Sequence, residues 1–152
     1  MSNCGCKGKG NSELLCKCDN TPITFASVNV GADPTTFISL TTDKLLVTEK
    51  DWIAKIDSMV VIQADVADGT SLPLILFYEI ERITGNTTKS LCRYAVNDNR
   101  DGQYTLTPNN TVCDEPGLGC HQYRLSVTGL IQQGVSLTFN CRCINVTTFQ
   151  KR

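Results

Sequence analysis

Cysteine pairs dominate the residues of this sequence that could do chemistry. Of its 152 residues nine are cysteine, and six of the nine form C-x-C pairs. These pairs are CGC at 4–6, CKC at 16–18 and CRC at 141–143. In an extended chain, residues two apart point to the same side, so each pair presents two sulfurs in one direction. The cysteines are therefore candidates for metal ligands, redox groups or disulfide partners.

The two cysteines of one pair cannot easily bond each other. Consecutive Cα atoms are about 3.8 Å apart, so an extended i, i+2 pair spans roughly 6.5–7 Å, at or beyond the outer limit of disulfide geometry. Each pair therefore needs an external partner. Cys4, Cys6, Cys16 and Cys18 together offer four thiolates, enough for a tetrahedral zinc site. Structural zinc sites more often use C-x2-C to C-x4-C spacing, so we predict no metal and no other cofactor.

Catalysis has few candidate residues. His121 is the only histidine, and its neighbour Cys120 would point to the opposite face of a strand, so we expect a surface or rim histidine. Glu79 and Glu81 share one face of a predicted strand, but with Arg82 nearby they suggest an exposed polar face rather than a tuned acid pair. We therefore predict that the protein is not an enzyme.

Composition favours one ordinary domain with a hydrophobic core. Its length suits one domain, and 41% of the residues are hydrophobic, enough to fold without cross-links. The formal net charge is −1 and the basic residues are scattered, so no nucleic-acid or membrane partner is predicted. The longest apolar run, around residues 72–78, is interrupted by Pro73 and is too short to span a bilayer.

The leader MSNCGCKGKGNSELL lacks the apolar run of at least seven residues that a secretory signal needs. We therefore expect synthesis in a cytosol, where thiols are normally kept reduced. On that expectation the cysteines bind metal, act in redox chemistry, or oxidise after the compartment is lost. Nine is also an odd number, so if every cysteine formed a disulfide, at least one bond would leave the chain.

The chain divides into an arm and a body. Residues 1–20 are polar, with glycines separated by lysines, and predict a flexible N-terminal connector. Between Cys6 and Cys16 this connector can extend roughly 30–36 Å, comparable with the width of a small domain. Residues 21–152 are predicted to form the folded domain. An arm of this reach can dock on a neighbouring subunit.

The body is predicted to be all-β. Eight segments are rich in β-branched and aromatic residues and are separated by Gly, Asn, Asp and Pro turns, such as TGNTT at 84–88 and TPNN at 107–110. These segments are 23–30, 36–40, 58–66, 72–83, 91–96, 103–107, 121–130 and 134–146. The stretch 48–56 could form one helical turn, but a strand or irregular link is preferred. About eight short strands indicate an antiparallel sandwich, either a jelly roll or an immunoglobulin-like arrangement.

Alternation within two of these segments predicts the faces that build the core. One face carries Val60, Ile62, Ala64 and Val66, and another carries Tyr123, Leu125, Val127 and Ile131. Sandwiches have open edge strands, and unprotected edges pair with other chains. Head-to-tail pairing of this kind gives rings if the rotation closes and helices if it does not.

In its layout the sequence resembles the endospore appendage subunits, which form pilus-like fibres on the spores of certain bacteria. The resemblance rests on a cysteine-bearing N-terminal connector, a further cysteine before the first strand, a threonine-rich body and cysteine in the last strand. It implies an eight-stranded antiparallel jelly-roll sandwich whose connector forms disulfides with subunits of the adjoining layer. It also implies synthesis in the mother-cell cytoplasm and a final place on the endospore surface, with a spore-surface anchor protein as a possible partner besides other copies of the chain.

By position, the resemblance implies a role for each cysteine of the three pairs. Cys4 and Cys6 would be the connector donors, and the acceptors would be Cys16, Cys18, Cys141 and Cys143. The family's commoner pattern has two adjacent cysteines in the connector, whereas this chain has CGC. The chain is therefore more similar to the ladder-like type, in which rings stack and connectors join ring to ring, than to the staggered helical type.

Three cysteines lie outside this scheme. Cys113 and Cys120 flank a loop with a Pro-Gly turn, so we predict an intramolecular bridge between them, and we predict Cys92 to be a buried thiol.

The function expected is that of a self-assembling structural subunit. Two alternatives stay open: a cytosolic metal- or redox-responsive thiolate domain, and a jelly-roll adhesion or carbohydrate-binding module.

Overall fold

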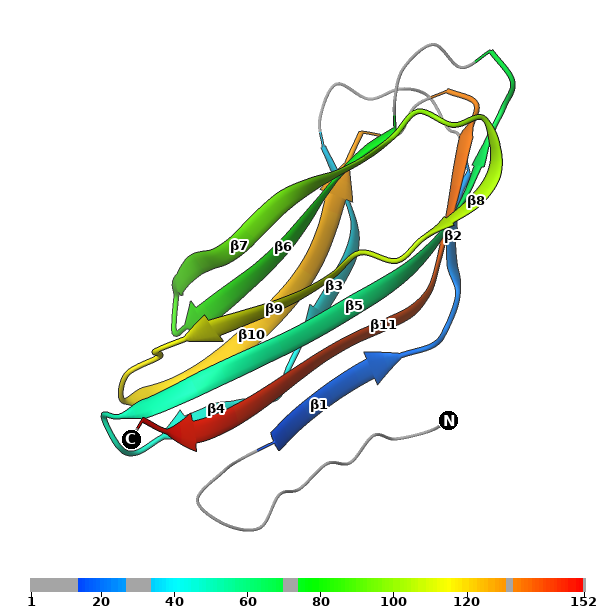
Figure 1. Cartoon of the computed structure of the whole chain (residues 1–152). Helices are drawn as coiled ribbons and strands as arrows, with labels where there is room; N and C mark the ends of the chain where they lie inside the picture. Colours follow the sequence, from blue (N-terminus) through cyan, green and yellow to red (C-terminus); the bar gives the residue numbers. More distant parts are fainter. Residues whose placement is uncertain (1–13, 27–33, 70–73, 131–132, 152) are drawn as a thin grey trace.

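The computed structural model describes residues 14–26, 34–69, 74–130 and 133–151. Within these ranges every regular element is a β-strand, and the strands form two antiparallel sheets packed face to face (Figure 1). The predicted all-β antiparallel sandwich is confirmed. Residues 48–56, where a helical turn was the less favoured option, contain the start of a long strand. The described residues therefore include no helix that could span a membrane.

The larger sheet has six strands and is built around its two longest. These are β5 (Trp52–Val66) and β11 (Val135–Gln150), which pair with each other. On the other side of β11 lie β1 (Leu14–Asp19) and β2 (Ile23–Phe25), and on the other side of β5 lie β8 (Gly102–Leu106) and β9 (Asn109–Asp114). Each flank of this sheet is thus shared between two short strands that pair with different parts of one long strand.

The smaller sheet has five strands in the order β3-β10-β6-β7, with β4 also paired to β10. Their bounds are β3 (Thr35–Thr41), β4 (Leu45–Val47), β6 (Leu74–Thr84), β7 (Thr87–Asp98) and β10 (Gly119–Gly129). The β6–β7 hairpin turns at Gly85, whose φ of 57° suits the first central position of a tight two-residue turn. That turn was predicted from the TGNTT sequence.

The core lies between the two sheets and follows the predicted alternation. Val60, Ile62, Ala64 and Val66 on β5 are all buried, as are Tyr123, Leu125 and Val127 on β10. The remaining residue of the second predicted face, Ile131, lies outside the described residues. Close packing requires glycine at position 129, because a Cβ on Gly129 would lie 2.9 Å from the Ile75 carbonyl oxygen.

Buried polar side chains join the two sheets across this core. The Tyr78 hydroxyl on β6 donates to Ser58 Oγ on β5 at 2.6 Å. The Tyr123 hydroxyl on β10 donates to Asp114 Oδ2 on β9 at 3.0 Å, and Arg82 Nη1 on β6 pairs with the same carboxylate at 2.7 Å. Because buried polar groups are stable only when they are paired, these contacts fix the relative position of the two sheets.

The strands of the structure differ from the expected ones in three places. Residues 14–19, the last part of the predicted connector, form β1 and pair with β11. β9 occupies Asn109–Asp114, whose first two residues were expected to form a turn. The short β4 was not predicted. In total eleven strands lie in the described residues where the sequence suggested about eight.

Candidate functional site

The candidate site is a cysteine cluster where β1 meets β11. In the antiparallel pairing of these strands Cys18 lies directly opposite Cys143, and Cys16 lies opposite Asn145. Opposed residues in an antiparallel pair project to the same face, so both β1 cysteines and Cys143 share one face of the six-stranded sheet. Their neighbours on β11, Arg142 and Ile144, are buried and point the other way. The cysteine face is therefore the outer face of the sandwich.

Cys141 joins this face two residues before Cys143. Its sulfur lies 4.0 Å from the sulfur of Cys143, which is contact without a bond. The expectation that a C-x-C pair presents two sulfurs in one direction without bonding each other holds for this pair. The pairing of β11 with β5 shifts register between Phe139 and Arg142, beside this pair. Such irregularities re-aim side chains next to them.

Burial and crowding lower the acidity of the central thiol. Cys16, Cys18, Cys141 and Cys143 are all half-buried. Burial raises the pKa of Cys143 well above its ordinary value, and its contacts with the thiols of Cys18 and Cys141 raise the pKa further. A thiol attacks disulfides and binds metals as the thiolate. Cys143 is thus a thiol that stays protonated at neutral pH.

A buried arginine holds β1 in register beside the cluster. The side chain of Arg142 is only 5% exposed, and its Nη2 lies 2.7 Å from Asp19 Oδ2 at the end of β1. Its Nη1 donates to the carbonyl of Thr21 at 2.8 Å and to that of Asn140 at 3.1 Å. Leu15 packs against the core at the other end of the strand. These anchors position Cys18 against Cys143, and no sequence motif pointed to them.

The predicted donor cysteines, Cys4 and Cys6, lie outside the described residues. Of the predicted acceptors, the structure brings Cys18, Cys141 and Cys143 together in one group and places Cys16 on the same face. β1 begins at Leu14, so the N-terminal connector enters the sheet at the strand that carries two of the acceptors.

The other cysteines lie elsewhere. Cys113, opposite Lys55, and Cys120, opposite Leu46, are exposed and are not joined to each other, so the predicted bridge between them is not formed here. Cys92 is half-buried rather than buried, and its sulfur accepts a hydrogen bond from the Asn110 side chain. Both thiols therefore lie at the surface, on different strands.

The lone histidine is not at the surface, contrary to expectation. His121 is 2% exposed, and its ring nitrogens lie 2.8 Å from Thr84 Oγ1 and 3.1 Å from the carbonyl oxygen of Gly117. Both ring nitrogens are thus occupied by neighbours. Their hydrogen bonds allow a polar ring to be buried next to β4, and the sequence carried no signal for either partner.

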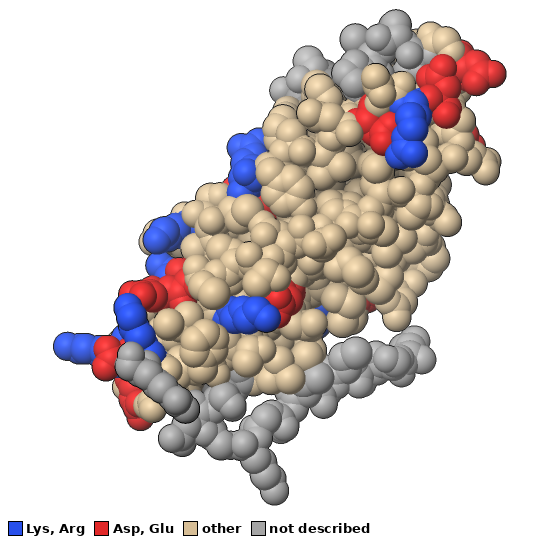
Figure 2. Space-filling model, in the orientation of Figure 1, with Lys and Arg blue, Asp and Glu red and all other residues tan. Residues whose placement is uncertain are grey.

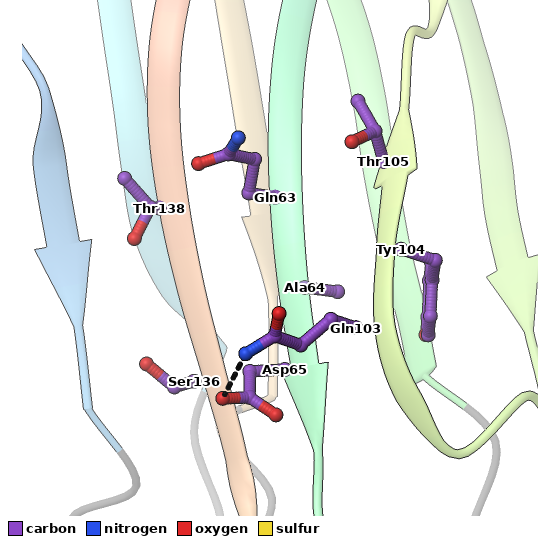
Figure 3. Close-up of a pocket in the computed structure, with 8 residues that line it drawn as sticks. All are labelled: Gln63, Ala64, Asp65, Gln103, Tyr104, Thr105, Ser136 and Thr138. Carbon is purple, nitrogen blue, oxygen red and sulfur yellow. Dashed lines mark hydrogen bonds between the residues drawn. The ribbon is translucent and has the colours of Figure 1, made fainter.

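A polar hollow of about 370 Å³ lies on the outer face of the same sheet, across β11, β5 and β8 (Figure 3). Its lining residues are Gln63, Ala64, Asp65, Gln103, Tyr104, Thr105, Ser136 and Thr138. Gln103 donates to Asp65 at 3.4 Å across it. The Arg100 guanidinium lies over one face of the Tyr104 ring, with its Cζ 4.5 Å from the ring centroid, so a sugar cannot stack on that face. The hollow can offer hydrogen bonds through amide, carboxylate and hydroxyl side chains.

Charge on this side of the molecule is mixed in sign. In Figure 2 the blue and red side chains occur in small groups of both signs, separated by a broad uncharged surface. The ion pairs of the described residues include Lys55 with Asp57 at 3.2 Å and Lys151 with Glu115 at 3.0 Å. Electrostatic attraction of a strongly charged partner is therefore not a property of this face.

Among the described residues no group of three or more His, Cys, Asp or Glu side chains is arranged to hold a metal ion. Comparison of the sequence with protein-family models gave no match, and comparison with curated proteins gave none.

Proposed function

We propose that the protein is a structural subunit that self-assembles into rings or fibres joined by disulfides between copies. The observation that carries this proposal is the cluster of Cys18, Cys141 and Cys143 on the outer face of the sandwich, at the strand into which the connector leads. Thiols grouped on an outer face are placed to react with a partner outside their own domain. Cys4 and Cys6 are the proposed donors, and Cys16 belongs with the cluster as an acceptor.

We infer that the sandwich is a jelly roll with eight strand positions. Three positions are each shared by two consecutive short strands, namely β1 with β2, β3 with β4, and β8 with β9. Numbering the eight positions along the chain gives the order 1-8-3-6 in one sheet and 2-7-4-5 in the other. This order supports a jelly roll over an immunoglobulin-like arrangement, because the chain crosses between two four-stranded sheets at every connection except the one between positions 4 and 5.

Assembly would use the edges of these sheets. The ordered paths end in β1 and β8 in one sheet and in β3 and β7 in the other, and edge strands present unpaired backbone groups to other chains. Repeated head-to-tail pairing would give a ring or a helix, and disulfides would then make its lifetime depend on bond breaking. The proposed partners are therefore other copies of this chain, together with an anchor at the spore surface.

The resemblance to endospore appendage subunits supplies the proposed setting. The chain would be made without export in the mother-cell cytoplasm and would become oxidised once that cell lyses and exposes the spore surface. The CGC connector and the broad acceptor face suit stacked rings joined by connectors. No enzymatic step is proposed, and the buried, fully bonded His121 offers no accessible base.

The test begins with purified full-length protein examined by electron microscopy and by gel electrophoresis after boiling in detergent, with and without reductant. We expect polymers that survive boiling and collapse on reduction. The variant Cys4→Ser/Cys6→Ser should lose the boiling-resistant species, whereas Cys113→Ser/Cys120→Ser, which also removes two thiols, should keep it. Polymers of Cys4→Ser/Cys6→Ser that resist boiling as well as the unaltered chain would contradict the proposal.

The same preparation separates the alternatives. A monomer that carries stoichiometric zinc would favour a metal-responsive thiolate domain. A stable monomer that binds glycans through the polar hollow around Gln63 and Gln103 would favour an adhesion module.

A further inference from the structure

We propose that Cys18 and Cys143 form a disulfide within one subunit, and that this bond is the one the connector of another copy exchanges with. The first half of the proposal rests on the geometry of β1 and β11 alone. The second half rests on the proposed function, because it needs a second copy to supply the connector thiol. Together they identify the cysteine that first accepts the connector and the disulfide whose exchange joins the copies.

Backbone spacing allows a bond between Cys18 and Cys143. Residues directly opposite in an antiparallel pair have Cα atoms about 4.5 or 5.5 Å apart, according to whether the pair is hydrogen-bonded. Both distances fall inside the range of about 4.4–6.8 Å that disulfides span. Cys18 and Cys143 are such a pair, and their thiols already contact each other. The bond needs rotation of two side chains and no movement of the strands.

No other pair in the cluster has this advantage. Cys141 and Cys143 are two apart in one strand, and their sulfurs are 4.0 Å apart, about twice the length of a disulfide bond. Cys16 lies opposite Asn145, so its relation to Cys143 is diagonal, with a separation of roughly 7–8 Å. The same diagonal relation separates Cys18 from Cys141. The register therefore selects one bond from the four cysteines.

Bond formation requires an oxidant, for which we name a small-molecule disulfide of the glutathione class. A thiolate of the pair attacks this disulfide and releases one small thiol, which leaves a mixed disulfide on the protein. The second cysteine of the pair then loses its proton, attacks the mixed disulfide and releases the second small thiol. Two protein thiols become one disulfide, and one external disulfide becomes two thiols.

The connector step needs no further oxidant. A connector thiolate of a second copy attacks Cys143 or Cys18, its bond to that sulfur forms as the bond between Cys18 and Cys143 breaks, and the displaced cysteine takes up a proton. The number of disulfides stays the same. The raised pKa of Cys143 makes its thiolate a poor leaving group, so the expected attack is on Cys143 with Cys18 as the displaced sulfur. A disulfide within one subunit is thus converted into a disulfide between two subunits.

Trypsin makes the in-subunit bond directly readable, because cleavage after lysine and arginine separates the four cysteines. Cys16 falls in peptide 10–17, Cys18 in 18–44, Cys141 in 125–142 and Cys143 in 143–151. The full chain carrying Cys4→Ser/Cys6→Ser is equilibrated with oxidised and reduced glutathione, blocked with N-ethylmaleimide in denaturant, and digested. We expect peptides 18–44 and 143–151 to be linked to each other.

Mixing unlabelled chains with ¹⁵N-labelled chains shows whether that link lies within one subunit. An in-subunit bond gives only light–light and heavy–heavy pairs, whereas a bond between copies gives mixed pairs as well. The matched control is Cys16→Ser, which removes a thiol of the same strand and face but should leave the link intact. Mixed pairs, a link from peptide 18–44 to any other peptide, or no link at any glutathione ratio would overturn the in-subunit bond.

The exchange step is tested by transfer. Labelled Cys4→Ser/Cys6→Ser protein with its bond formed is freed of glutathione and mixed, without oxygen, with reduced unlabelled full-length chain. We expect light peptide 1–7 to become linked to heavy peptide 143–151, with one Cys18 thiol freed on the heavy chain for each connector thiol consumed. Absence of this link would overturn the exchange. If the in-subunit bond forms but no polymer is seen under any condition, the proposed function falls while the bond between Cys18 and Cys143 stands.

Discussion

Two edges of the sandwich use cysteine in different ways. At one edge β7 and β9, which belong to different sheets, are joined by hydrogen bonds: the Tyr94 hydroxyl donates to the Asn109 carbonyl at 3.0 Å, and the Asn110 side chain donates to the sulfur of Cys92. At the β1 edge the cysteines point away from the core, on the outer face of one sheet. A single thiol thus serves contacts inside the domain, and a group of thiols faces outward.

This difference shows that grouping marks the candidate site better than exposure does. Cys113 and Cys120 are more exposed than any cysteine of the cluster, yet each lies apart from the others. The cluster is half-buried, and its thiols contact one another. A disulfide exchange site needs several sulfurs within reach more than it needs full exposure.

The largest effect should come from removing the buried carboxylate of β9, which joins this strand to β6 and β10. Replacing Asp114 with alanine leaves Arg82 with only the Glu115 carbonyl at 3.2 Å and removes the acceptor for the Tyr123 hydroxyl. Losing one partner of a buried pair costs about 3–5 kcal/mol, and the part exposure of Arg82 places the expected loss near the lower value, about 3 kcal/mol. Urea unfolding of the reduced protein measures it.

The control for this prediction is Glu115→Ala, the neighbouring position. Its ion pair with Lys151 is well exposed at 3.0 Å, and such pairs contribute about 0–1 kcal/mol. Equal losses of unfolding free energy in the two variants would show that the buried pair does not hold the sheets together.

The two edges should also differ in thiol reactivity. In reductant that does not react with iodoacetamide, at neutral pH, we expect Cys143 to be alkylated at least about tenfold more slowly than Cys113, because each unit of raised pKa lowers the thiolate fraction tenfold. The rate for Cys143 should rise as the pH is raised above the ordinary cysteine pKa. Mass spectrometry over time measures both rates, from peptide 143–151 and from peptide 101–124, in which fragmentation distinguishes Cys113 from Cys120. Equal rates would contradict the protonated, buried thiol.

A smaller effect is expected from the hydrogen bond that joins β7 to β9. Tyr94→Phe removes the bond to Asn109 and should lower the free energy of unfolding by about 1 kcal/mol. Tyr104→Phe is the matched control, since the Tyr104 hydroxyl is buried without a hydrogen-bond partner in the described part of the chain. Its removal should cost nothing or stabilise the protein. A greater loss of unfolding free energy in Tyr104→Phe than in Tyr94→Phe would show that the Tyr94 hydrogen bond does not stabilise this edge.

Much of the fold could be predicted because its strands alternate clearly. β5 and β10 bury the residues that the alternation selected, and the β6–β7 turn lies at the predicted Gly85. Strands without that pattern were missed. Asn109 and Asn110 favour turns, but in β9 they pair with Met59 and Ser58 of β5, so tertiary pairing overrides local preference.

The candidate site could be predicted only in part. The C-x-C spacing correctly predicted that Cys141 and Cys143 point the same way. It could not predict that Cys18 lies opposite Cys143, because this depends on which long strand β1 joins and on its register. The anchors that set the register, Arg142 and Asp19, are far apart in the sequence and form no motif.

The smallest expected effect concerns the anchor of the β1 edge in acid. The Thr21 amide donates to Asp19 and, with Arg142 beside it, lowers the pKa of this carboxyl below 3.8. A carboxyl whose pKa is lower in the folded state stabilises the fold at pH above 3.8, and this stabilisation is lost as the pH falls through the folded pKa. The unaltered protein should therefore lose more stability between pH 5 and pH 3 than Asp19→Asn does.

The difference should be modest, because the Asp19 side chain is 40% exposed and water screens its pairing. Urea midpoints at pH 7, 5, 4 and 3 give it directly. Asp98, whose pKa is also lowered, chiefly by its hydrogen bonds with Arg100, is present in both proteins, so its contribution cancels in the comparison. Parallel curves for the two proteins would mean that the Asp19 charge does not anchor β1. The register of Cys18 against Cys143 would then depend on Leu15, on the hydrogen bond from Arg142 to the Thr21 carbonyl and on the backbone pairing.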